Sequence, residues 1–363
     1  MKFRCERDGL VEAISTVGRA VSGRGSALPV LSGALVELSG DDLTLTGTDL
    51  DMTIRVRIGV DGQSDGRAVL PARLASDIVR ALEPGAVTVE VDDEEARISS
   101  GRSEFAVRLL SVDDYPQVGE VGGDPVVVPA EQLAGGLSQV VRAASKDDSR
   151  PTLTGVLFQA EPGGLRLVAT DSYRLAVRDL PGTSVLSEGQ QVLVPGRALT
   201  ELVRVLGDAE EVGVILGERE VAFVLEGVEL STRLIEGEFP NYRQLVPTDY
   251  PNELSVGREA LLDAVRRVRL LAREATPVRV GQQADAIDLT AITQDVGQAH
   301  ESLDASYSGE DLVVAFNPEY LLDGVEALDG DEVKVQTRDA LKPVVLRGND
   351  PDFLYLLMPV RVS

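Results

Sequence analysis

The sequence predicts an α+β protein built from three repeated domains, each a doubled βαβββ unit. The first observation is a passage of three short strands that occurs three times. It starts at Gly33, returns 122 positions later at Gly155, and has a weaker third copy from Val278. The second observation is a proline at the start of one helix in each copy, with spacings of 124 and 123 positions. These prolines are Pro71, Pro195 and Pro318.

The clearest copy of the repeated passage runs from Gly155 to Arg178. Its apolar runs are Val156–Gln159, Leu165–Ala169 and Arg174–Arg178, separated by a Pro-Gly-Gly turn and a polar turn. Short runs rich in Val and Leu between Gly, Pro, Asp and Ser are typical of a β-meander.

The first domain reads as a strand, a helix and three strands, twice over. Met1–Cys5 is predicted to be an edge strand, and Asp8–Val21 carries apolar residues at helical spacing with Asp8 as its N-cap. A Gly/Ser loop over 22–27 leads to the first meander. The other predicted elements are the meander 33–58, strand Arg67–Leu70, helix Pro71–Leu82, and strands Ala86–Val91, Ala96–Ser99 and Glu104–Leu109.

The second and third domains repeat this order. The second has strand Val126–Val128, helix Glu131–Ser145, the meander 155–178, strand Gln191–Val194, helix Arg197–Leu206, and strands 211–216, 220–225 and 228–234. The third has helix Arg258–Arg273, strands to about 307, strand Asp311–Phe316, helix Pro318–Leu328, and strands 332–337, 343–347 and Phe353–Pro359.

The predicted domain boundaries are 1–119, 125–247 and 253–363, with linkers at 117–124 and 246–252. An aromatic or apolar residue followed by proline marks each domain end, at Tyr115-Pro116, Phe239-Pro240 and Met358-Pro359. Three like domains joined head to tail predict an arc-shaped subunit. A head-to-tail contact with the right rotation closes into a ring, so two arcs would form a dimeric ring of six domains.

Composition limits the chemistry that the chain can support. The single Cys5 excludes an intramolecular disulfide framework and a cysteine-rich metal site, and the single His300 leaves little for histidine-based catalysis. We therefore expect no cofactor and no metal. Neither a secretion signal nor an apolar run of membrane-spanning length is present, which predicts a cytoplasmic protein.

The net charge of −25 argues against a simple nucleic-acid binder, because phosphate contacts need a basic face. The distribution of charge along the chain weakens this argument. The six predicted helices together carry a net charge of +2, so the negative charge lies mainly on strands and loops.

Two stretches could suggest catalysis. The run Thr170-Asp-Ser-Tyr-Arg174 brings a hydroxyl near a carboxylate, but no nucleophile elbow surrounds Ser172, and a turn that caps its own backbone explains it better. The acidic run Asp92–Glu95 lies between two predicted strands and reads as a hairpin turn. No glycine-rich nucleotide loop occurs.

Motifs in all three domains resemble those of the bacterial DNA polymerase III β subunits, the sliding clamps. They are Thr46-Gly-Thr-Asp-Leu50, Ser100-Gly-Arg-Ser103, Val168-Ala-Thr-Asp-Ser-Tyr-Arg-Leu-Ala176, Glu238-Phe-Pro-Asn-Tyr-Arg243, Phe316-Asn-Pro-Glu-Tyr320 and Leu356-Leu-Met-Pro-Val-Arg-Val362. The resemblance implies a non-catalytic homodimeric ring in the cytoplasm, at the nucleoid. Such a ring encircles duplex DNA without reading its sequence and tethers the replicative polymerase for processive synthesis.

A basic helical lining facing DNA follows from the resemblance. The candidate residues are Arg24, Arg73, Arg80, Arg142, Lys146, Arg197 and Arg204. The last helix, with Glu319, Asp323 and Glu326, departs from a basic lining. Helices favour arginine in any case, which is the alternative explanation.

The resemblance also implies a pocket between the second and third domains that takes short peptide motifs. Its implied partners are the polymerase α subunit, the clamp loader, and other polymerases and repair proteins. The matching residues are Leu153, Thr170, Ser172, Tyr173, Arg174, Leu175, Pro240, Gln244, Leu245, Asn317, Tyr320, Leu341, Pro343, Leu356, Leu357, Met358, Pro359, Val360 and Arg361. A wall of Leu, Val, Pro and Met suits an extended apolar peptide. The alternative for the leucines is ordinary core packing.

Several pocket positions differ from some family members. Tyr173 stands where some relatives have His, and Gln244 where some have Arg. Near Ala275 other members offer an aromatic side chain.

The dimer seam is expected to join the last strand of the first domain, around Glu104–Leu109, to the start of the third domain of the other subunit. The apolar candidates are Phe105, Val107, Leu270 and Leu271, with Arg102, Glu104, Arg269 and Arg273 as ion-pair candidates. Packing of Phe105 and Val107 inside their own domain is the competing interpretation. For the whole chain, the alternative function is a repetitive β-rich scaffold or a carbohydrate-active protein.

Overall fold

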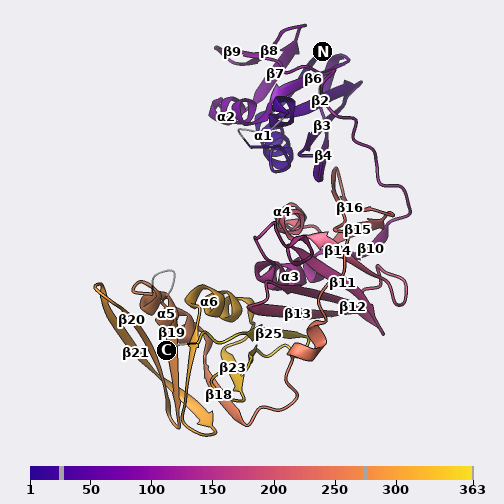
Figure 1. Cartoon of the computed structure of the whole chain (residues 1–363). Helices are drawn as coiled ribbons and strands as arrows, with labels where there is room; N and C mark the ends of the chain where they lie inside the picture. Colours follow the sequence, from indigo (N-terminus) through magenta and orange to yellow (C-terminus); the bar gives the residue numbers. More distant parts are fainter. Residues whose placement is uncertain (24–27, 273–275, 362–363) are drawn as a thin grey trace. The chain divides into compact units, whose positions relative to one another are not determined.

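The computed structural model describes residues 1–23, 28–272 and 276–361. They form two compact units (Figure 1). Unit 1 comprises Met1–Glu131 and Glu201–Leu234, and unit 2 comprises Gln132–Thr200 and Ile235–Ser363.

A five-stranded sheet in unit 1 has the order β5-β1-β7-β8-β9. Its strands are β1 (Lys2–Glu6), β5 (Asp61–Ser64), β7 (Ala86–Val91), β8 (Glu95–Ser100) and β9 (Ser103–Arg108). The prediction that the first strand is an edge strand is wrong, because β1 pairs with β5 on one side and β7 on the other. Its unforeseen partner, Asp-Gly-Gln-Ser, has no apolar alternation to reveal it as a strand.

An eight-stranded sheet in unit 1 has the order β10-β15-β16-β17-β4-β3-β2-β6. Its strands are β2 (Gly33–Ser39), β3 (Asp42–Thr48), β4 (Met52–Gly59), β6 (Gly66–Pro71), β10 (Val126–Pro129), β15 (Glu211–Leu216), β16 (Glu220–Leu225) and β17 (Val228–Arg233). Strands from two successive repeats meet where β4 pairs antiparallel with β17, with Met52 opposite Thr232. We call this contact the first junction.

Helices α1 (Arg7–Val17) and α2 (Ala72–Ala81) pack side by side in unit 1 (Figure 1). Leu10, Ile14 and Val17 form the buried stripe of α1 at the predicted helical spacing. Two details differ from the prediction. Asp8 lies in the first turn instead of capping it, and the helix ends at Val17, four residues early, where the chain turns at Gly18.

Unit 2 contains a twelve-stranded sheet with the order β14-β11-β12-β13-β25-β24-β23-β18-β21-β20-β19-β22. Its strands are β11 (Gly155–Glu161), β12 (Gly164–Thr170), β13 (Arg174–Pro181), β14 (Gln191–Pro195), β18 (Asn252–Gly257), β19 (Val278–Gln283), β20 (Ala286–Thr293), β21 (Gly297–Ser308), β22 (Leu312–Phe316), β23 (Glu332–Thr337), β24 (Val344–Arg347) and β25 (Phe353–Leu357). The second junction is the pairing of β13 with β25, where Leu175 lies opposite Leu356.

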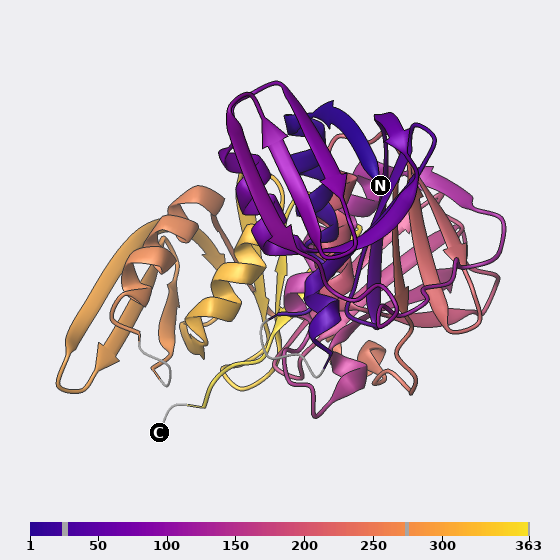
Figure 2. The same ribbon diagram turned by 90° about the horizontal axis from the view of Figure 1, so that it is seen from above.

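The remaining α-helices are α3 (Ala130–Val140), α4 (Gly196–Leu206), α5 (Arg258–Arg269) and α6 (Pro318–Ala327). Helices α5 and α6 lie side by side in both views (Figures 1 and 2). Short 3₁₀ turns occur at η1 (Pro29–Ser32), η2 (Val141–Ala143), η3 (Pro151–Leu153) and η4 (Tyr242–Leu245). The predicted helix over 131–145 therefore ends early, because α3 tightens into η2.

Asn317 shows how the sequence sets a helix start. Its side chain accepts hydrogen bonds from the main-chain N–H groups of Glu319 at 2.9 Å and Tyr320 at 3.3 Å, and Pro318 occupies the first helical position. None of the helices in the described part of the chain is long and apolar enough to span a membrane.

Candidate functional site

The turn between β12 and β13 contributes residues to the predicted peptide pocket at the second junction. The hydroxyl of Thr170 donates to the carbonyl of Arg174 at 2.6 Å and accepts from the N–H of Ser172 at 3.2 Å. The carboxylate of Asp171 accepts from the N–H groups of Tyr173 and Arg174. These bonds hold Ser172 at a φ of 80°, a conformation that few residues other than glycine adopt. These are the local bonds expected of a turn, and the Ser172 hydroxyl accepts from Arg150 at 3.2 Å.

Arg174 is buried at the second junction, with 6% exposed. Its guanidinium pairs with Asp171 at 3.0 Å and with Asp323 of α6, and it lies 4.3 Å from the ring centre of Tyr320. A buried charge needs partners of this kind, because desolvation otherwise outweighs the benefit of folding it inside. The contacts therefore tie the turn to α6.

Two tyrosines form an aromatic pair beside this cluster. The rings of Tyr173 and Tyr320 stack with centroids 6.4 Å apart, and Tyr173 is 59% exposed. The N–H of Met358 donates to the carbonyl of Tyr173 at 2.8 Å, so the segment after β25 runs beside the pair. Burial raises the pKa of Tyr355, whose neutral hydroxyl donates to the carbonyl of Tyr320 at 3.1 Å.

The predicted pocket residues divide into a buried floor and an exposed rim. Leu153, Leu175, Leu356 and Leu357 are buried, as the core interpretation expects. Leu175 and Leu356 belong to a cluster whose edge is formed by half-buried residues that include Met358. The rim carries large apolar side chains that solvent reaches: Tyr173, Leu245, Leu341 and Val360. These exposed apolar side chains are available to a ligand.

The other predicted pocket residues differ in their exposure to solvent. Pro240, Gln244 and Arg361 are exposed, Pro343 and Pro359 are half-buried, and Asn317 caps α6. Sequence reasoning missed Asp323 and Tyr355 as supports of Arg174. No local signal connects them to it, because they are 149 and 181 positions away along the chain.

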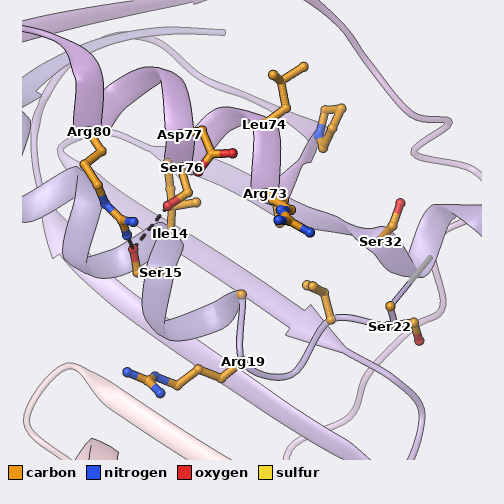
Figure 3. Close-up of a pocket in the computed structure, with 15 residues that line it drawn as sticks. Ile14, Ser15, Arg19, Ser22, Ser32, Arg73, Leu74, Ser76, Asp77 and Arg80 are labelled. Atoms are coloured by element: carbon orange, nitrogen blue, oxygen red, sulfur yellow. Dashed lines mark hydrogen bonds between the residues drawn. The ribbon is translucent and has the colours of Figure 1, made fainter.

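Residues of α1 and α2 line a groove of about 760 Å³ in unit 1 (Figure 3). Arg73 and Arg80 lie two turns apart on α2, on the same side of the helix. Both line the groove together with Arg19, which the sequence prediction did not include. Arg80 donates to the hydroxyl of Ser15 on α1 at 3.0 Å. The arrangement can accept an anion between the two helices.

Other predicted DNA-facing residues differ in their surroundings. Arg204 pairs with Glu201 at 2.6 Å, and Arg19 approaches the same carboxylate at 3.2 Å. Lys146 and Arg197 are exposed. Arg24 lies outside the described residues.

The acidic helix α6 is neutralised by arginines. Glu326 accepts from Arg142 at 3.3 Å and from Arg266 at 3.0 Å, while Glu319 pairs with Arg269 at 3.1 Å. Asp323 pairs with Arg174. Arg142, predicted to face DNA, pairs with Glu326 of α6 and keeps 31% of its side chain exposed.

Among the residues that the structure describes, open edges occur on β9, which was predicted to lie at the dimer seam, and on β21, which was not. β9 pairs only with β8, and the segment 297–304 of β21 pairs only with β20. Phe105 is 40% exposed and Leu270 is 80% exposed, while Leu271 is half-buried. Val107 departs from the prediction, because only 3% of it is exposed and it packs inside its own sheet.

The four candidate ion-pair residues of the seam have different surroundings. Arg102 and Glu104 are exposed. Arg269 already pairs with Glu319. Arg273, like Ala275, lies outside the described residues.

Three family models match successive segments of the chain. The N-terminal, central and C-terminal domains of the DNA polymerase III beta subunit match residues 1–119, 127–241 and 243–361.

Individual relatives agree over the whole length. The beta sliding clamp of Streptomyces coelicolor is 34% identical over 381 residues, covering 100% of both proteins. The crystal structure of the DNA polymerase sliding clamp from Bacillus subtilis superimposes with a TM-score of 0.91 at 33% identity, covering 100% of both chains. The DNA polymerase III subunit beta from Pseudomonas aeruginosa gives 0.90 at 28% identity, with the same coverage. These matches exclude the alternative interpretation of the chain as an unrelated β-rich scaffold.

We predict that Arg174→Met destabilises the protein by about 3 kcal/mol, because it leaves Asp171 and Asp323 without their shared partner. Chemical denaturation measures the free energy of unfolding. The matched control is Arg243→Met, which removes an exposed arginine paired with Glu161 and should cost less than about 1 kcal/mol. Equal losses in both variants would contradict the proposed importance of the buried cluster.

Proposed function

The chain belongs to the family of DNA polymerase III β subunits, the β sliding clamps, and we propose that two copies close head to tail into a ring around duplex DNA. As a member of this family it is a DNA sliding clamp, a processivity factor without catalytic activity of its own. The three domains 1–119, 125–247 and 253–363 are the proposed structural repeats of that ring.

The observation that carries the ring proposal is the repetition of one strand contact. β4 pairs with β17 at the first junction, and β13 pairs with β25 at the second. The third equivalent of β4 and β13 is the start of β21, since Met52, Arg174 and Gly297 occupy corresponding places 122 and 123 positions apart. β9 corresponds to β17 at a spacing of 125 positions.

We therefore place β9 of one subunit against the open segment of β21 in the other. This pairing supports closure because it satisfies main-chain groups that both edges leave open. It also offers a reason for the exposure of Phe105 and Leu270, which a partner subunit would cover.

The basic groove between α1 and α2 supports contact with DNA. Arg19, Arg73 and Arg80 line it, and phosphate contacts by arginine need no base sequence. In unit 2, arginines neutralise the acids of α6. Lys146, Arg197 and Arg204 are proposed as further phosphate contacts.

The second junction is proposed as the site for partner peptides. Buried Leu175 and Leu356 form its floor, and the exposed Tyr173 beside Tyr320 forms its rim. This combination suits an extended peptide with apolar anchors. The partners proposed for it are the polymerase α subunit, the clamp loader, and other polymerases and repair proteins, in the cytoplasm at the nucleoid.

We predict that Phe105→Asp converts the dimer to a monomer, because a carboxylate at the seam would be buried without a partner. Sedimentation velocity measures the mass. Val127→Asp is the control, since Val127 is also an exposed apolar residue on an outer strand. A dimer that persists in Phe105→Asp would contradict the proposed seam.

We predict that Arg73→Gln combined with Arg80→Gln weakens duplex binding and flattens its dependence on salt by about one unit of logarithmic slope for each arginine. Fluorescence anisotropy of a labelled duplex across a salt series measures this. Arg97→Gln on β8, more than half exposed and outside the groove, should leave the slope unchanged. An unchanged slope in the double variant would remove these residues from the proposed DNA contact.

A further inference from the structure

The first junction contains a groove of about 110 Å³ within unit 1. Its position in the repeat is that of the proposed peptide pocket at the second junction. We propose that this groove is a second binding site, for an extended peptide segment that carries a small hydrogen-bonding side chain next to a basic one. The inference goes beyond the proposed function, because it rests on the geometry and chemistry of the first junction.

The turns that border the two junctions have the same internal bonds. At the first junction the hydroxyl of Thr48 donates to the carbonyl of Met52 at 3.0 Å and accepts from the N–H of Leu50 at 3.1 Å. The carboxylate of Asp49 accepts from the N–H groups of Asp51 and Met52. The φ of Leu50 is 81°, against 80° for Ser172. The repeat has therefore kept the backbone of the turn even though leucine is a costly residue at positive φ.

The strands behind the turns also correspond. Thr53 lies opposite Ser231 at the first junction, as Leu175 lies opposite Leu356 at the second. Eight of the twelve residues around the groove correspond to residues of the predicted peptide pocket. These eight are Thr48, Leu50, Asp51, Thr53, Pro116, Ser231, Thr232 and Arg233. The first junction is thus a copy of the second in backbone construction.

The side chains give this copy a different chemistry. Hydroxyls of Thr53 and Ser231 replace the leucines of the floor, and Arg233 replaces Met358. The Thr53 hydroxyl already donates to Thr48 at 2.9 Å. Ser231 is 9% exposed and lines the groove. A serine hydroxyl that lines an open groove can both donate a hydrogen bond to a ligand and accept one from it.

The rim indicates the charge of the ligand. Asp51 and Glu220 present exposed carboxylates, while Arg233 is the single cation of the lining, 3.9 Å from Glu220. Leu50 is 43% exposed beside them. A lysine could lay its aliphatic stem on Leu50 and bring its ammonium to the carboxylates. The small volume, against roughly 30 Å³ for one water in the liquid, favours serine, threonine or asparagine as the inserted side chain.

The test uses two pools of fluorescein-labelled, acetylated heptapeptides on the full chain. One pool places Ser, Thr or Asn between Lys and Arg residues, and the other places Leu, Met and Phe in a neutral background. Ser231→Leu fills the groove at the first junction. Asp51→Asn removes one negative charge from its rim and leaves the residues inside it unchanged. Tyr173→Ala alters the second junction, and Asp93→Asn is an exposed carboxylate in unit 1 outside the groove.

The expected result is that the polar, basic pool binds the unaltered chain and loses about tenfold in affinity with Ser231→Leu and with Asp51→Asn. It should bind Tyr173→Ala and Asp93→Asn normally. No binding of this pool, or equal binding to Asp51→Asn and the unaltered chain, would overturn the proposal even if Ser231→Leu failed to fold. If only the apolar pool failed to bind, the result would count against the proposed peptide site at the second junction. The proposed site at the first junction would be unaffected.

Discussion

Main-chain pairing across the junctions is the constraint on which the rest of the structure depends. The meander that ends one repeat leaves an outer strand whose N–H and C=O groups need partners. β17 and β25 find those partners in the preceding repeat, at β4 and β13. The same arrangement leaves β9 and part of β21 open within one chain, so the repeat that builds the chain also prepares it for a second copy.

Charge is distributed unevenly over this architecture. Strands and loops carry most of the acidic residues, while the helices hold arginines that face either a groove or an acidic neighbour. At α6, arginines from α5, from η2 and from β13 neutralise the helix, so its acids join elements of unit 2. A chain with a net charge of −25 can then still offer cations to a phosphate backbone in the groove between α1 and α2.

The sequence predicted the fold well where its signal was periodic. The repeated meander and the buried stripe of α1 follow from apolar spacing, which tertiary contacts only reinforce. The failures have local causes. β5 is short and polar, so its pairing with β1 could not be foreseen, and α1 ends at Gly18 although apolar residues continue the helical spacing.

The turn at the candidate site was predictable from the sequence, but the residues that support Arg174 were not. The turn at Thr170 can be read from the sequence, because its bonds are local. The partners of Arg174 could not be, since Asp323 and Tyr355 reach it only through the pairing of β13 with β25. Val107 and Arg142 show the same limit, because burial and ion pairing depend on neighbours distant in sequence.

The most direct test of the ring is retention on DNA whose topology is then changed. The protein is loaded onto a nicked circular duplex with its clamp loader and ATP, and the circle is cut once. The account predicts that the protein remains on the circle through gel filtration in high salt and is lost after linearisation, because encirclement holds it there. Loss from the intact circle, or retention that the cut does not change, would contradict a closed ring around DNA.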